Sequence, residues 1–156
     1  MTTTNTTAKT TTHLRDLALL AARVGLGVVL IAHGWQKFDE FGIEGTAASF
    51  DQMGVPLPTV SAWFAALVEL VGGAALIIGL AVPLVGLLVV IDMIGAWWFV
   101  HRDGGIFVAE GGYELVLTIG VAALLLAAFG AGRWGLDRLL FGRRSRSDRR
   151  QTVPAH

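Results

Sequence analysis

Long apolar runs separated by short polar segments dominate the sequence. The first run, residues 14–35, is long enough to cross a bilayer, since a helix needs about 20 apolar residues to do so. Residues 58–100 carry only two charged side chains, and a stretch of this length must contain two such helices joined by a tight reversal. Gly79 and Pro83 supply the reversal, because proline cannot continue a helix interior and glycine tolerates the turn. The pattern therefore predicts an all-α bundle of four transmembrane helices, at about 14–35, 59–80, 83–101 and 113–130.

The segments outside these runs complete the predicted organisation. Residues 1–13 are threonine-rich and low in complexity, so we expect a disordered tail. Residues 14–140 form the membrane domain, and residues 141–156 form a basic tail. In the first loop, Thr46 to Met53 should form a short amphipathic helix, because Gly54 and Pro56 follow it as stop signals. A signal peptide is disfavoured, because the first run is long and three more spans follow.

The basic residues predict the orientation in the membrane. Lys9, Arg15 and seven arginines from Arg133 to Arg150 flank one side of the bundle, and only Lys37 and Arg102 flank the other. Cytoplasmic segments are enriched in lysine and arginine, so both termini should be cytoplasmic and the loops 36–58 and 101–112 should face outward. An aromatic belt is expected near the outer boundary from Trp35, Trp97, Trp98 and Tyr113.

Composition narrows the classes of function. Hydrophobic residues make up 54% of the chain and its formal net charge is zero, so there is no basic field and no case for nucleic acid. The chain contains no cysteine, which excludes disulfides, thiolate metal ligands and dithiol redox relays. His33, His101 and Glu110 lack the spacing of a metal site, and none is expected.

Three charged residues interrupt the predicted spans. At 1.5 Å per residue, Arg23 lies about 18 Å below Trp35, Glu69 about 15 Å below Thr59, and Asp92 about 14 Å below His101. All three then fall near the middle of a hydrocarbon core about 30 Å thick. A charge there usually faces a partner or a cavity, so we expect Arg23 to pair with Glu69, Asp92 or both. The pair has two interpretations, a structural link between helices and a path for protons or a ligand.

Polar side chains also gather where the spans reach the outer boundary. His33 and Lys37 end the first span, His101 ends the third, and Tyr113 and Glu114 begin the fourth. They predict a polar cup above the charged midplane. A haem between His33 and His101 is disfavoured, because histidines at the water boundary more often hydrogen-bond to loop groups.

Five short motifs resemble the DoxX family over about residues 14–140. They are RVGLGVVLIAHGWQK (23–37), MGVPLP (53–58), ELVGG (69–73), GGYEL (111–115) and WGLD (134–137). The resemblance implies a four-helix integral protein of the bacterial plasma membrane. Family members are linked to membrane oxidoreductase complexes, including a quinone-reducing enzyme that oxidises thiosulfate and a detoxifying complex with a sulfurtransferase and a superoxide dismutase. The positions that match the family are Arg23, His33, Gly34, Lys37, Glu69, Gly111, Gly112 and Glu114.

The leading hypothesis is a membrane subunit of an oxidoreductase system with a quinone-type site in the outer half of the bundle. The expected proton-transferring residues are His33, Lys37, Glu69 and Glu114, and the expected cofactor-binding residues are Arg23, Trp97, Trp98, His101 and Tyr113. The chain has no evident flavin or iron–sulfur motif, so electron transfer would need a bound quinone or a redox partner protein. The alternatives are a proton-coupled transporter, which with four spans would need a homodimer, and a non-catalytic scaffold that positions soluble enzymes through the basic tail.

Overall fold

The computed structural model describes residues 4–141, and all regular secondary structure in that part of the chain is helical, with no strand. The predicted all-α class is therefore confirmed. The α-helices are α1 (Thr4–Trp35), α2 (Gly42–Gln52), α3 (Pro58–Ile78), α4 (Val82–Ala96), α5 (Glu114–Phe129) and α6 (Leu136–Phe141). Two π-helical turns, η1 (Gln36–Glu40) and η2 (Trp97–His101), continue α1 and α4, and a 3-10 turn, η3 (Val108–Glu110), precedes α5.

Three helical segments are long and apolar enough to cross a membrane: Thr12–Glu40, Pro58–Ile78 and Val82–His101. The fourth predicted span, α5, is equally apolar but has only 16 residues. Its length is about 24 Å, which is less than the hydrocarbon thickness of about 30 Å. The structure thus contains three full-length spans and one shorter apolar helix among the described residues.

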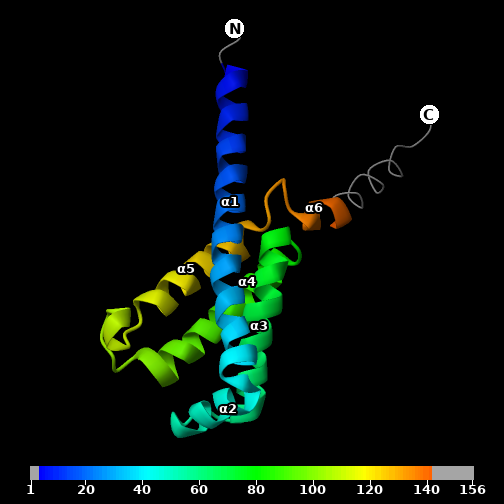
Figure 1. Cartoon of the computed structure of the whole chain (residues 1–156). Coiled ribbons are helices and arrows are strands. Elements are labelled where there is room, and N and C mark those ends of the chain that lie inside the picture. The colour runs from blue at the N-terminus through cyan, green and yellow to red at the C-terminus, as the bar shows by residue number, and fades with distance from the viewer. Residues whose placement is uncertain (1–3, 142–156) are drawn as a thin grey trace, which may run out of the picture.

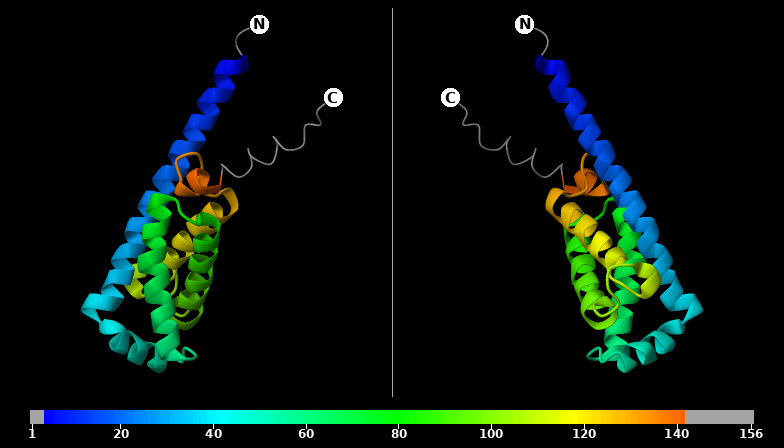
Figure 2. Two further views of the ribbon diagram at one scale, coloured as in Figure 1. Left: turned by 90° about the vertical axis from the view of Figure 1, so that its right-hand side faces the viewer. Right: turned by 90° about the vertical axis from the view of Figure 1, so that its left-hand side faces the viewer.

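The helices pack as two antiparallel pairs, α1 with α3 and α4 with α5, and α2 lies across one end of the bundle (Figure 1). Glycines let α1 and α3 approach closely: a Cβ at Gly27 would lie 2.6 Å from the carbonyl oxygen of Gly73, and one at Gly34 2.5 Å from the backbone nitrogen of Leu70. The apolar core between the pairs includes Leu30, Leu76, Val89, Ala123 and Leu126. α6 lies beside α1 at the end of the bundle opposite α2 (Figure 2).

Polar contacts of Asp137 connect α6 to the turn between α3 and α4 at the α6 end of the bundle. The turn between α3 and α4 has positive φ angles at Gly79 (74°) and Ala81 (49°). Both carboxylate oxygens of Asp137 accept hydrogen bonds from this turn, from the backbone N–H of Ala81 at 2.6 Å and of Val82 at 3.1 Å. Asp137 thereby caps the start of α4 from 55 residues away.

The ends of the chain differ from the expectation. α1 begins at Thr4, so residues 4–13, predicted as a disordered tail, continue the helix; extending an existing helix is far easier than nucleating one. The expected helix at Thr46 to Met53 overlaps α2, which begins earlier, at Gly42. The predicted basic tail lies almost wholly outside the described residues, in 142–156.

Candidate functional site

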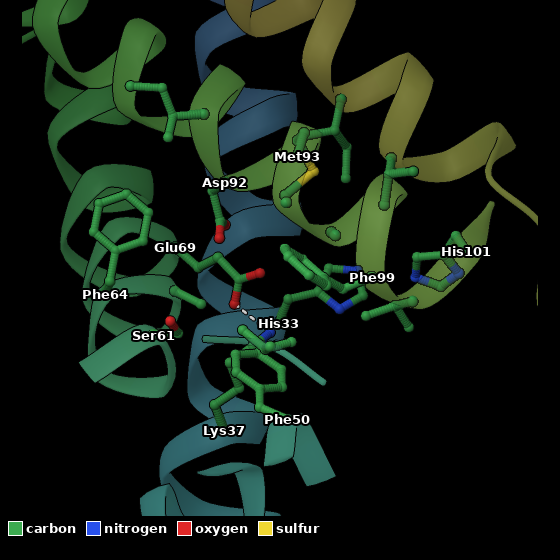
Figure 3. A pocket seen from close by; sticks show the side chains of 18 of the residues that line it. His33, Lys37, Phe50, Ser61, Phe64, Glu69, Asp92, Met93, Phe99 and His101 are labelled. Carbon is green, nitrogen blue, oxygen red and sulfur yellow. Dashed lines mark hydrogen bonds and ion pairs between the residues drawn. The ribbon is translucent and has the colours of Figure 1, made fainter. Parts of the chain in front are cut away.

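A cavity of about 510 Å³, the central cavity, lies toward the α2 end of the bundle (Figure 3). Its walls are mostly apolar, and the aromatic part comes from Phe50 on α2, Phe64 on α3 and Phe99 in η2. Six polar side chains also line it: His33, Lys37, Ser61, Glu69, Asp92 and His101. Small-molecule sites commonly combine apolar walls with a few polar groups in this way.

The central cavity contains a buried ion pair. Lys37 Nζ lies 2.6 Å from Glu69 Oε2, and the two side chains are only 18% and 8% exposed. Lys37 belongs to the π-helical turn η1, and such turns re-aim the side chains that follow an α-helix. The charge of Glu69, on α3, is therefore neutralised by the segment that extends α1.

Asp92 supplies a second carboxyl group to the same cavity. Its Oδ2 is buried and has no hydrogen-bond partner within residues 4–141. Figure 3 shows the Asp92 and Glu69 side chains pointing toward one another from α4 and α3. Among the described residues that line the cavity there are two carboxyl groups, Glu69 and Asp92, but only one lysine or arginine, which is Lys37 and which pairs with Glu69.

Two histidines contribute nitrogen atoms to the cavity. His33 comes from α1, and His101 ends η2. His101 Nδ1 lies 2.9 Å from the carbonyl oxygen of Gly111. A carbonyl can only accept a hydrogen bond, so Nδ1 carries the proton in this contact and Nε2 of the neutral ring is an acceptor. Within the described residues no group of three or more His, Asp or Glu side chains could hold a metal ion.

The predicted pairing of Arg23 with Glu69 or Asp92 is wrong. Arg23 is fully buried at the α6 end, where its Nη2 donates to the carbonyl oxygen of Trp134 at 3.3 Å. The depth estimate took Trp35 as the outer end of the first span, whereas the helix continues through η1 to Glu40. That extension is about 7.5 Å and accounts for only part of the difference. The rest comes from the crossing of α1 and α3, where Gly34 lies against the backbone of Leu70. The residue beside Glu69 is therefore Lys37, which the sequence placed at the outer boundary.

The structure brings His33, Lys37, Glu69 and His101 together and places the other predicted site residues elsewhere. Glu114 Oε1 accepts the backbone N–H of Val108 at 2.8 Å and so holds the loop before α5. Trp97 and Tyr113 line a separate hollow of about 480 Å³. Trp98 packs edge-on against Trp97, with the Arg102 guanidinium 5.0 Å from its ring centre.

Sequence reasoning missed two aromatic wall residues, Phe50 and Phe64. Phe50 lies on α2, and its apolar character was the only signal that the loop helix faces the bundle. Phe64 lies five residues before Glu69, and residues at that spacing do not lie on the same face of a helix. The sequence therefore did not indicate that Phe64 and Glu69 line one cavity. Phe99 is the third aromatic wall residue, whereas Trp97, Trp98 and Tyr113, which were expected to bind the cofactor, do not line the cavity.

Comparison with known proteins identifies the family. The family model of DoxX matches residues 18–102, which is more than half of the chain. The chain belongs to the DoxX family. This DoxX protein is 35% identical to "Putative oxidoreductase CatD" of Bacillus subtilis, over 81% of this chain and 89% of the relative. It is 34% identical to "Inner membrane protein YqjF" of Escherichia coli, over 81% of this chain and 95% of the relative.

A third relative, "Uncharacterized membrane protein Rv3486" of Mycobacterium tuberculosis, is 30% identical over 79% of this chain and 81% of its own length. No solved structure matches the chain significantly. The family and the apolar helices together make this DoxX protein a multi-pass protein of the bacterial plasma membrane.

Proposed function

We propose that this DoxX protein is a membrane subunit of an oxidoreductase system and that the central cavity binds a quinone-type ring. The observation that carries the proposal is the Lys37–Glu69 pair, placed 2.6 Å apart inside a largely apolar cavity. An apolar ring with two carbonyl oxygens needs flat hydrophobic walls and a few hydrogen-bond donors. Phe50, Phe64 and Phe99 offer the walls.

The polar groups would hold the carbonyl oxygens and manage protons. The Lys37 ammonium and a protonated ring nitrogen of His33 can donate hydrogen bonds to a carbonyl. Glu69 and Asp92 can release or take up a proton when the ring changes its redox state. The relative CatD bears the printed name of a putative oxidoreductase, which supports the same class of function. The chain has no cysteine and no evident flavin or iron–sulfur motif, so with a quinone bound in the cavity the electrons would come from a redox partner protein.

The test is binding of a quinone to the purified protein. We expect short-chain ubiquinone or menaquinone to raise the melting temperature in mild detergent by several degrees, because a ligand that binds only the folded state stabilises it. Phe99→Ala and Glu69→Gln should lose most of this shift. The matched control, Glu110→Gln, changes an exposed acid outside the cavity and should keep it. An unchanged melting temperature with both quinones, together with no quinone retained from the membrane, would refute the proposal.

The second carboxyl group favours one alternative, a proton-coupled transporter. Asp92 has no hydrogen-bond partner on Oδ2 within the described part of the chain, as expected for a group that exchanges a proton or a cation. In proteoliposomes, this function predicts substrate-driven proton flux that Asp92→Asn abolishes and Glu110→Gln leaves intact. A scaffold acting through the tail would instead lose its partners on deletion of residues 143–156, which lie outside the described residues.

A further inference from the structure

A second hollow, the arginine hollow, opens at the α6 end of the bundle and has a volume of about 720 Å³. It forms where α1, the start of α4, the end of α5 and α6 come together (Figure 2). Three arginines border it: Arg15, Arg133 and Arg138. None of these groups takes part in the central cavity, so the hollow stands apart from the proposed quinone site.

Two of the arginines are already held in place. The Arg15 guanidinium lies 5.7 Å from the centre of the Phe129 ring, which steers its charge over the end of α5. Arg133 is held by Asp16 on α1, through a backbone hydrogen bond of 3.1 Å to Oδ1 and an Nε–Oδ2 distance of 3.7 Å. Both charges are therefore positioned before any ligand arrives, which lowers the entropic cost of binding.

Two acidic residues also border the arginine hollow, but both are engaged. Asp137 uses its two oxygens for the backbone of Ala81 and Val82. Asp16 binds the backbone N–H of Arg133. Asp16 also pairs with the Arg133 guanidinium. Three guanidinium groups and two carboxylates border the hollow, and this leaves one positive charge in excess, so the hollow attracts an anion. Arginine forks suit phosphate oxygens in particular.

The wall beside the arginines is apolar and faces outward from the bundle. It includes Pro83 and Leu84 at the start of α4 and Phe129 at the end of α5, and the last two are 59% and 56% exposed. A ligand that fits both parts carries a phosphate next to hydrocarbon. We propose that the arginine hollow binds the head group of an anionic phospholipid, with an acyl chain along Leu84 and Phe129. The basic bias of this end also predicts that it faces the cytoplasm, where arginines near the surface bind anionic lipid.

The test is native mass spectrometry of the full-length protein in mild detergent with added phosphatidylglycerol or phosphatidylcholine. We expect phosphatidylglycerol to be retained in preference to phosphatidylcholine. The double variant Arg15→Gln/Arg138→Gln should lower the affinity for phosphatidylglycerol at least about tenfold, since each arginine contributes to anionic-lipid binding. The matched control, Arg102→Gln, removes an exposed arginine at the other end of the bundle and should leave the affinity unchanged.

Three results would overturn this proposal: equal retention of the two lipids, equal affinity of the native protein and the double variant, or displacement of phosphatidylglycerol by inorganic phosphate at low millimolar concentration. The last would mean that the hollow recognises a free anion. Circular dichroism of the double variant checks its fold. If it does not fold, Arg138→Gln alone should still weaken binding, because the Arg138 side chain is exposed on α6.

Discussion

At the scale of single residues, Lys37 decides the chemistry of the central cavity. It is the cation that Glu69 contacts, and it comes from a position that the sequence places at the membrane boundary. Removing one partner of a buried pair is costly, because the other charge is left in an environment of low polarity. Arg23 is buried, as expected, but it does not contact an acidic side chain. Its guanidinium donates to a backbone carbonyl at the other end of the bundle.

Lys37→Met should therefore lower the free energy of unfolding by about 2 kcal/mol, somewhat less than for a fully buried pair because Lys37 is 18% exposed. The double variant Lys37→Met/Glu69→Leu should recover most of that loss, since no charge is then left unpaired at position 69. Thermal melting in detergent, followed by the helical circular dichroism signal, measures both.

The control for this pair is Arg102→Gln, which breaks an exposed ion pair with Asp103 and should change stability by no more than about 0.5 kcal/mol. If Lys37→Met and Arg102→Gln lowered the free energy of unfolding by the same amount, the Lys37–Glu69 contact would stabilise the protein no more than an exposed ion pair does.

At the scale of elements, the crossing of α1 and α3 sets the register that brings Lys37 beside Glu69. Gly34 lies against the backbone of Leu70, the residue next to Glu69. The π-helical turns η1 and η2 then carry Lys37 on one side of the cavity and Phe99 and His101 on the other. Two π-helical turns at one cavity are consistent with the association of such turns with functional sites.

Gly34→Ala should push α1 away from α3 and destabilise the protein by about 2 kcal/mol, because the added Cβ would lie 2.5 Å from the Leu70 nitrogen. Gly25→Ala on the same helix is the matched control. A Cβ there meets nothing within 4 Å, and alanine favours a helix, so stability should hold or rise by up to about 1 kcal/mol. Similar melting temperatures for the two variants would contradict the close crossing.

At the scale of the whole molecule, the bundle separates two sites of different chemistry. The central cavity lies toward α2, and the arginine hollow lies at the α6 end. α1 begins and α6 lies at the same end of the bundle, as expected for an even number of crossings (Figure 2). The positive-inside rule predicts that this end is cytoplasmic, and with that orientation the central cavity is expected in the outer half of the membrane.

The absence of native cysteines allows a direct test of that orientation. A cysteine at Asp103, which is 91% exposed in the loop after η2, should react with a membrane-impermeant maleimide in intact cells. A cysteine at His13, exposed near the start of α1, should react only after the membrane is permeabilised. The reverse pattern would invert the assignment and place the central cavity on the cytoplasmic side.

The apolar runs by themselves determined that the chain is an all-α membrane protein with several apolar helices, because burying backbone polar groups in lipid permits few solutions. They did not determine where each span ends, since the first helix continues past Trp35 to Glu40. They also singled out Arg23, Glu69 and Asp92 as unusual. Which charges meet was decided only by the tertiary structure. Helix register depends on close packing at Gly27 and Gly34 and on the π-helical extension of α1. Gly27 and Gly34 lie seven residues apart on one helix face, but that spacing does not say which residues of α3 they meet. Lys37 lies 14 residues after Arg23. The register of α1 against α3 therefore differs by about four helical turns from the one in which Arg23 would meet Glu69.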